Sequence, residues 1–381
     1  MRQLLKYELI KLFWRKSVLI VFLLLMCVYG WILFYNQEQY VDASKIYHPY
    51  ARSMTEADYK KVESISRKAM EKEESMSDRL PLHELGLLYD IAHVQHRKEH
   101  YAASLEQIRE ELSTYAQNTF EYKKIALAEQ LLIDKGVPSD EVYYNKPWAN
   151  IMYMHDQLGV LFMGAMILIG IAPLYSSEYS SRVDSLLLSS RHGRRKLVSA
   201  KCYAAIIYTL AFSSVFALLT LSVHAFLFGN LDGSQTPLYS LARYVDTFDF
   251  QHAPFSLTVG QYYLIQLTIH ALGCIAFAMA VMFISSISYS SFITFMISGS
   301  IVAIPYLLLD VRNVRHPITE WLVTYSYSQF IRVSNMFSSF KAVNVGGEPV
   351  LYPFVALCVV TIVTLALIWG TRAIFSRRQS C

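Results

Sequence analysis

The residues with the most defined chemistry lie in a polar segment between two apolar runs. From Ser176 to Lys201 it reads SSEYSSRVDSLLLSSRHGRRKLVSAK, an acidic residue, a leucine run and then a basic cluster. A short helix of this kind, apolar on one side and charged on the other, gives a cytosolic protein a surface to hold. A loop that only set the membrane orientation would need the basic residues but neither Glu178 nor the leucine run.

Signatures of bond-making chemistry are absent from the sequence. We find no H-E-x-x-H, no G-x-S-x-G, and no paired carboxylates or His-Glu spacing at the membrane face, so we expect no enzyme activity. Without a G-x-x-x-x-G-K-[ST] loop the chain cannot hold a nucleoside triphosphate in the P-loop manner. Ligand spacings for zinc are also missing, and we expect no metal and no cofactor in this chain.

Composition indicates an all-α membrane protein. Hydrophobic residues make up 54% of the chain and charged residues only 17%. A helix needs about 20 apolar residues to cross a bilayer. Six runs qualify: Ser17–Tyr35, Gln157–Tyr175, Cys202–Phe228, Tyr262–Ile287, Ser291–Leu309 and Val350–Thr371. The first could be a signal peptide, but it ends in bulky Trp31, Phe34 and Tyr35 without a small-residue cleavage site, so we interpret it as an anchor.

Basic flanks orient the six predicted spans. Lys and Arg exceed Asp and Glu before the first span, between the second and third, and after the sixth. Such residues stay on the cytoplasmic side, so both termini, the loop 176–201 and the tail 372–381 are expected inside. Segments 36–156, 229–261 and 310–349 are then expected outside, the last as amphipathic pieces that dip into the outer interface.

The large segment 36–156 is predicted to be a helical, coiled-coil-like extracellular insert. From Leu87, apolar residues follow at alternating steps of four and three, with only Lys98 breaking the series: Ile91, Val94, Tyr101, Leu105, Ile108, Leu112 and Tyr115. A helix over Thr55–Ser77 is expected beside this seam, and Phe120–Asp134 is a candidate third helix. The helical insert is expected to end at Gly136-Val137-Pro138. The insert contains no cysteine, and both a spacer role and a ligand-binding role are open.

Two further groups are candidate functional residues. Residues 1–16, with Tyr7, Glu8 and Lys11, suit a helix lying in the membrane interface, although an ordinary basic flank is equally compatible. Gln266 and His270 lie one turn apart within the fourth span, where polar side chains either line a translocation path or join packed helices. We favour helix packing for this pair.

The sequence resembles the membrane subunits of type-2 ABC exporters (ABC-2 type permeases). The resemblance rests on Glu178-Tyr179, the link to Leu186-Leu187-Leu188, Ser189-Ser190, the Arg194-Arg195 pair, Ala200-Lys201 entering the third span and the opening Y-E-L-I-K at Tyr7–Lys11. It implies that Tyr179–Ser190 is a coupling helix seated on an ATPase. The residues assigned to that contact are Glu178, Tyr179, Arg182, Val183, Leu186, Leu187, Arg194 and Arg195.

The same resemblance implies the partners and the setting. Two cytosolic ABC ATPase subunits would bind ATP and magnesium, and a second permease subunit, identical or related, would complete the complex in a bacterial plasma membrane. Scarce intramembrane charge favours an amphipathic substrate, such as a peptide, an antibiotic or a lipid-like molecule. No nucleic-acid partner is expected. The alternative function is a membrane sensor or scaffold whose insert signals to a cytosolic partner.

Overall fold

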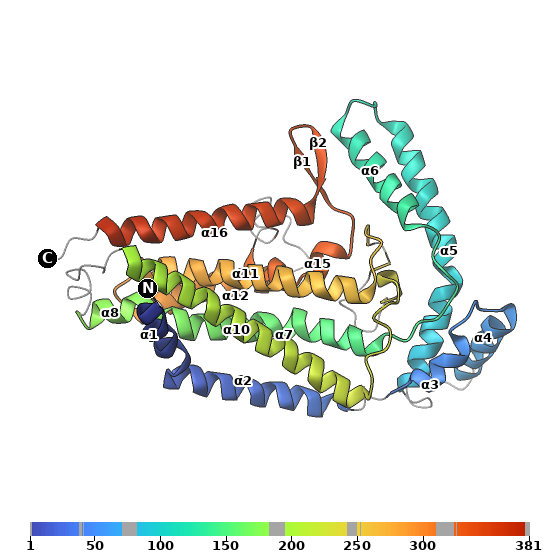
Figure 1. The fold of residues 1–381 in the computed structure, drawn as a ribbon. Coiled ribbons are helices and arrows are strands. Elements are labelled where there is room, and N and C mark those ends of the chain that lie inside the picture. The colour runs from blue at the N-terminus through green and yellow to red at the C-terminus, as the bar shows by residue number, and fades with distance from the viewer. Residues whose placement is uncertain are drawn as a thin grey trace.

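Helices dominate the computed structural model of the chain (Figure 1), which describes residues 2–37, 40, 42–70, 82–182, 195–241, 250–251, 253–309, 324 and 326–377. Long helices lie side by side in a bundle, and a second group projects from one end. The bundle consists of α1 (Arg2–Phe13), α2 (Lys16–Tyr35), α7 (Lys146–Ile171), α8 (Pro173–Ser180), α10 (Arg195–Phe228), α11 (Val259–Ile287), α12 (Ser291–Leu309) and α16 (Tyr352–Arg377).

Five of the described helices are long and apolar enough to cross a membrane. They cover Lys16–Tyr35, Lys146–Ser180, Lys196–Phe228, Val259–Ile287 and Tyr352–Phe375. α12 follows the fifth predicted run, but its apolar part, Ser291–Pro305, is shorter. Large apolar side chains such as Leu23, Phe292 and Trp369 are exposed on the bundle exterior. Because soluble proteins do not display apolar surface on this scale, the structure supports a membrane-embedded protein.

The core of the bundle surrounds α7. This helix packs against α2, α10 and α11, and most of its side chains are buried. α7 begins at Lys146, eleven residues before the predicted span, because Pro147 in the first turn suits a helix start and the chain stays helical from there. Residues expected to lie outside the span, His155 and Asp156 among them, therefore belong to α7.

The projecting group is the insert, and it is helical as predicted. Its elements are α3 (Ser44–Tyr47), the 3-10 turn η2 (His48–Tyr50), α4 (Glu56–Met70), α5 (Leu82–Thr114) and α6 (Phe120–Lys135). Ile91 and Val94 of α5 are buried in a small core with Val62 of α4. Farther along α5 the predicted seam faces α6, which runs back along it (Figure 1). The side of the membrane that holds the insert stays a prediction.

The remaining elements are short. They are η4 (Leu238–Ser240), α14 (Tyr327–Ile331), α15 (Ser334–Phe337), β1 (Ala342–Val345) and β2 (Glu348–Leu351). α14 packs into the bundle against the middle of α11, where Tyr327 stacks on Phe277. The two strands form an antiparallel hairpin whose turn residues, Gly346 and Gly347, both have positive φ. Glycine adopts this backbone without steric cost, which suits a two-residue hairpin turn. The purely α-helical expectation missed this hairpin.

Candidate functional site

A buried charge cluster joins three helices at the end of the bundle opposite the insert. Its centre is Lys201 of α10, whose side chain is fully buried. The Lys201 Nζ atom lies 2.6 Å from Glu178 Oε1 and 3.1 Å from Glu8 Oε1. It also donates to the Leu174 carbonyl at 3.2 Å and lies 5.2 Å from the centre of the Tyr175 ring.

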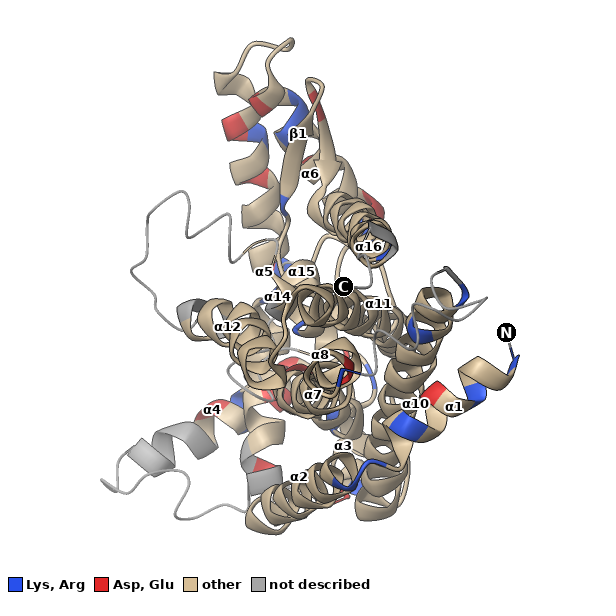
Figure 2. Cartoon of the chain, turned by 90° about the vertical axis from the view of Figure 1, so that its left-hand side faces the viewer, with Lys and Arg blue, Asp and Glu red and all other residues tan. Residues whose placement is uncertain are grey.

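A second ammonium completes the cluster. Lys11 Nζ of α1 donates to Glu178 Oε1 at 2.7 Å, so one carboxylate oxygen takes a hydrogen bond from each lysine. Two carboxylates and two ammonium groups balance in charge. A buried group of charges is stable only when the charges balance, since one unpaired buried charge costs on the order of several kcal/mol. Figure 2, which views this end of the bundle, shows the charged residues of α1 beside α10.

The helices position these four side chains for physical reasons. Glu8 and Lys11 are three residues apart and share one face of α1. Leu12 and Phe13 of the same helix pack into the bundle, with Phe13 stacked on Phe212. α1 is therefore held by apolar contacts as well as by charge, and it contacts α10 along its length.

Each carboxylate of the cluster keeps one oxygen without a hydrogen bond. Within the described part of the chain, Glu8 Oε2 and Glu178 Oε2 are buried and have no partner. Buried polar atoms in native proteins are nearly always paired. Each of the two oxygens can therefore accept a further hydrogen bond.

The predicted coupling residues fall into two groups. Glu178 and Tyr179 are buried in α8, where the Tyr179 hydroxyl donates to the Ser286 carbonyl at 3.2 Å. α8 ends at Ser180, and Arg182 has a φ of 55°, which breaks the helix there. Tyr179 thus belongs to the end of the second span. Val183, Leu186, Leu187 and Arg194 lie outside the described residues, as does the side chain of Arg195.

Of the three residues predicted in the interfacial helix, two reach the cluster. Glu8 and Lys11 do so, whereas the side chain of Tyr7 is exposed. Lys201, the centre of the cluster, was recognised in the sequence only as a basic residue at the start of the third span. A lysine directly before an apolar span is a signal that could have marked it, because an unpaired charge carried into the membrane would be costly.

Gln266 and His270 both face α7. The Gln266 amide donates to Asp156 Oδ1 at 2.8 Å and to the Met152 carbonyl at 3.2 Å. The His270 ring meets the His155 ring edge to face, with centroids 5.7 Å apart. These contacts join α11 to α7, as expected for polar groups between packed helices.

Asp156 extends this polar contact to the segment before the hairpin. Its side chain is 2% exposed, and its Oδ2 accepts a hydrogen bond from the Ser334 amide at 3.2 Å. Nearby, Arg332 donates to Gln157 Oε1 at 3.0 Å. A buried carboxylate in the bundle was missed in the sequence because the predicted span began one residue after it.

The remaining chemistry of the described residues is limited. Among them, no group of three or more His, Cys, Asp or Glu side chains is arranged to hold a metal ion. Comparison with known proteins found no match to a family model, a curated protein or a solved structure.

Proposed function

We propose that this chain is the membrane permease subunit of an ATP-driven exporter of the type-2 ABC class. Such a subunit binds no nucleotide itself and takes its energy from two ATPase subunits on the cytoplasmic side. It pairs with a second permease subunit, and the pair moves an amphipathic molecule outward across a bacterial plasma membrane. The termini and the segment 176–201 then face the cytoplasm.

The buried charge cluster is the observation that carries this proposal. Glu178 directly precedes the proposed coupling helix, Tyr179–Ser190, and Lys201 lies eleven residues after its end. Through Lys201, Glu178 is bonded to Glu8 of α1. A force applied to this segment would therefore move α1, α8 and α10 together, because separating these helices would leave buried charges without their ion-pair partners.

The direct test is affinity purification of the full chain in mild detergent, with mass spectrometry of the proteins that accompany it. The proposal expects an ATPase with a Walker loop. Leu187→Ala and Glu178→Ala should weaken its recovery, whereas Leu19→Ala, on an exposed face of α2, and Glu63→Ala, in the insert, should not. Failure to recover such an ATPase in several detergents would remove the energy source from the proposal.

The substrate class needs a separate measurement. The purified complex, reconstituted in vesicles, should hydrolyse ATP faster when it meets an exported molecule. We expect stimulation by an amphipathic peptide, antibiotic or lipid-like compound. Stimulation by sodium ions alone would contradict the substrate class.

A sensor or scaffold is the second candidate, and one contact favours it. Lys123 of α6 forms an ion pair with Glu348 of β2, and β2 leads directly into α16. The insert is thus tied to a helix of the bundle and could pass a signal along it. Copurification of a histidine kinase in place of an ATPase would favour this function.

A further inference from the structure

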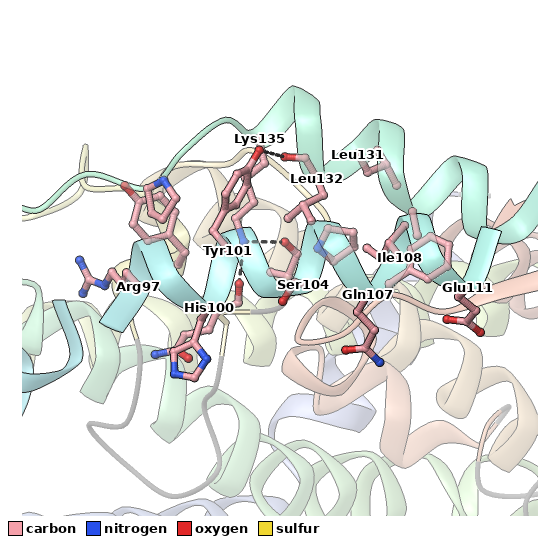
Figure 3. Close-up of a pocket in the computed structure, with 17 residues that line it drawn as sticks. Arg97, His100, Tyr101, Ser104, Gln107, Ile108, Glu111, Leu131, Leu132 and Lys135 are labelled. Carbon is pink, nitrogen blue, oxygen red and sulfur yellow. Dashed lines mark hydrogen bonds between the residues drawn. The ribbon is translucent and has the colours of Figure 1, made fainter. Parts of the chain in front are cut away.

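A cleft separates the insert from the loops at the near end of the bundle (Figure 3). Its volume is about 350 Å³, within the range of sites for small ligands. α5 and α6 form two of its walls. The rest comes from Pro138 and from segments at the near end of the bundle, with Tyr239, Gln251, Ala253, Pro254 and Phe340. Neither the charge cluster nor the polar contact around Asp156 lies in this cleft.

The α5 wall carries a row of polar side chains. His100, Ser104, Gln107 and Glu111 follow one another at steps of four, three and four residues, so they share one face of the helix. At a rise of 1.5 Å per residue, the row is about 17 Å long. The first three side chains can both donate and accept hydrogen bonds, and the fourth accepts them as a carboxylate.

The rest of the cleft lining is mainly apolar. It consists of Ile108, beside the polar row on α5, and of Ala128, Leu131, Leu132, Pro138, Ala253, Pro254 and Phe340. Figure 3 shows Leu131 and Leu132 above Ile108, with Gln107 and Glu111 pointing away from them. A ligand lying along α5 would meet the hydrogen-bonding groups of the row and the apolar groups beside them.

Several bonds hold the walls of the cleft in place. Lys135 Nζ donates to the carbonyls of Gln251 and Ala253 at 2.7 and 3.1 Å, which ties α6 to the loop of the bundle. The Tyr101 hydroxyl donates to the Leu132 carbonyl at 3.3 Å and ties α5 to α6. A site whose walls are already in position loses less conformational entropy when it binds a ligand.

We propose that the cleft binds a short amphipathic peptide, lying extended along α5 with an amino group near Glu111. An extended chain rises about 3.3 Å per residue, so a row of about 17 Å matches five residues. Peptide groups can pair with the polar row, whereas a plain acyl chain would cover that row without replacing its bonds to water. The Glu111 carboxylate complements a positively charged amino group. Binding here does not require transport, so the inference goes beyond the proposed function.

The test uses the full chain in lipid nanodiscs and a pentapeptide amide of sequence Lys-Leu-photo-leucine-Leu-Ser. After irradiation, mass spectrometry should locate the crosslinks in α5 and α6, within residues 97–111 and 128–138. Ala128→Trp fills the cleft and should abolish this labelling. Ala103→Trp makes the same change on the exposed face of α5 and should leave it intact.

Charge recognition is tested with a matched pair of variants. Glu111→Gln should weaken binding of the peptide about two- to fivefold, the effect of one exposed charge pair. Glu110→Gln, which removes an exposed charge that does not line the cleft, should leave binding unchanged. Crosslinks confined to the spanning helices, labelling that survives in Ala128→Trp, or displacement by decanoate but not by unlabelled peptide would each overturn the inference.

Discussion

Replacement of Lys201 by methionine tests whether the buried charge cluster holds the cytoplasmic end of the bundle together. The change keeps the length of the side chain and removes its ammonium. Glu8 and Glu178 then stay buried beside a single cation, Lys11, whose side chain is 37% exposed. Removal of one partner from a buried ion pair typically costs about 3–5 kcal/mol.

The expected destabilisation is large enough to be detected as opening of the part of α10 around Lys201. Cys202 follows Lys201 and is buried, so its reaction with N-ethylmaleimide reports opening of this part of α10. Serine in place of Cys27, Cys358 and Cys381 would leave only Cys202 and the buried Cys274. When reclosing is fast, the labelling rate follows the open population. A cost of about 3–5 kcal/mol then corresponds to a labelling rate about 10²- to 5 × 10³-fold higher.

Two further variants separate charge from size. Lys11→Met removes the half-exposed cation and should have a much smaller effect, since solvent screens its charge. Combining Lys201→Met with Glu8→Gln leaves the pair of Lys11 and Glu178, whose charged atoms lie 2.7 Å apart, and should restore slow labelling of Cys202. The reasoning is refuted if Lys201→Met changes the rate less than threefold, or if the double variant is no slower than the single one.

Two other predictions concern single side chains. Gly159→Ala should destabilise the protein by about 1–3 kcal/mol, because the new Cβ would lie 2.7 Å from His270 Cε1. Gly164→Ala is the control, because its new Cβ meets nothing within 4 Å. Apparent melting temperatures of the two variants in one detergent check this difference. Hydrogen bonds, mainly from Thr55 and then from Arg52, lower the pKa of Asp58 to about 2. The ionised Asp58 therefore contributes its full stabilisation above its ordinary pKa of 3.8, and this contribution is lost as the pH falls through 2. Carbon-13 NMR of a labelled chain should show this pKa, and Thr55→Val should raise it; an Asp58 pKa near 3.8 in the unmodified chain would contradict the hydrogen-bond assignment.

The sequence by itself was sufficient for the membrane class and for most helix positions. A membrane-spanning helix can be recognised from its own apolar run of about 20 residues, because a backbone in lipid must form its hydrogen bonds within the helix. For this reason the fifth run coincides with α12, from Ser291 to Leu309. The seam of α5 was also visible, since its period comes from the helix itself. The Gly346-Gly347 pair was a local signal as well, and it was overlooked.

Only the tertiary structure decided which polar residues meet. Glu8 and Lys201 are separated by just over half of the chain, and Asp156 and Ser334 are 178 residues apart. A charge beside an apolar run looks the same in a sequence whether it faces water or a buried partner. Its burial depends on how helices pack, and packing is determined by contacts between segments with no common sequence pattern. The cleft beside α5 has the same origin, because its walls come from helices and loops that only the fold brings together.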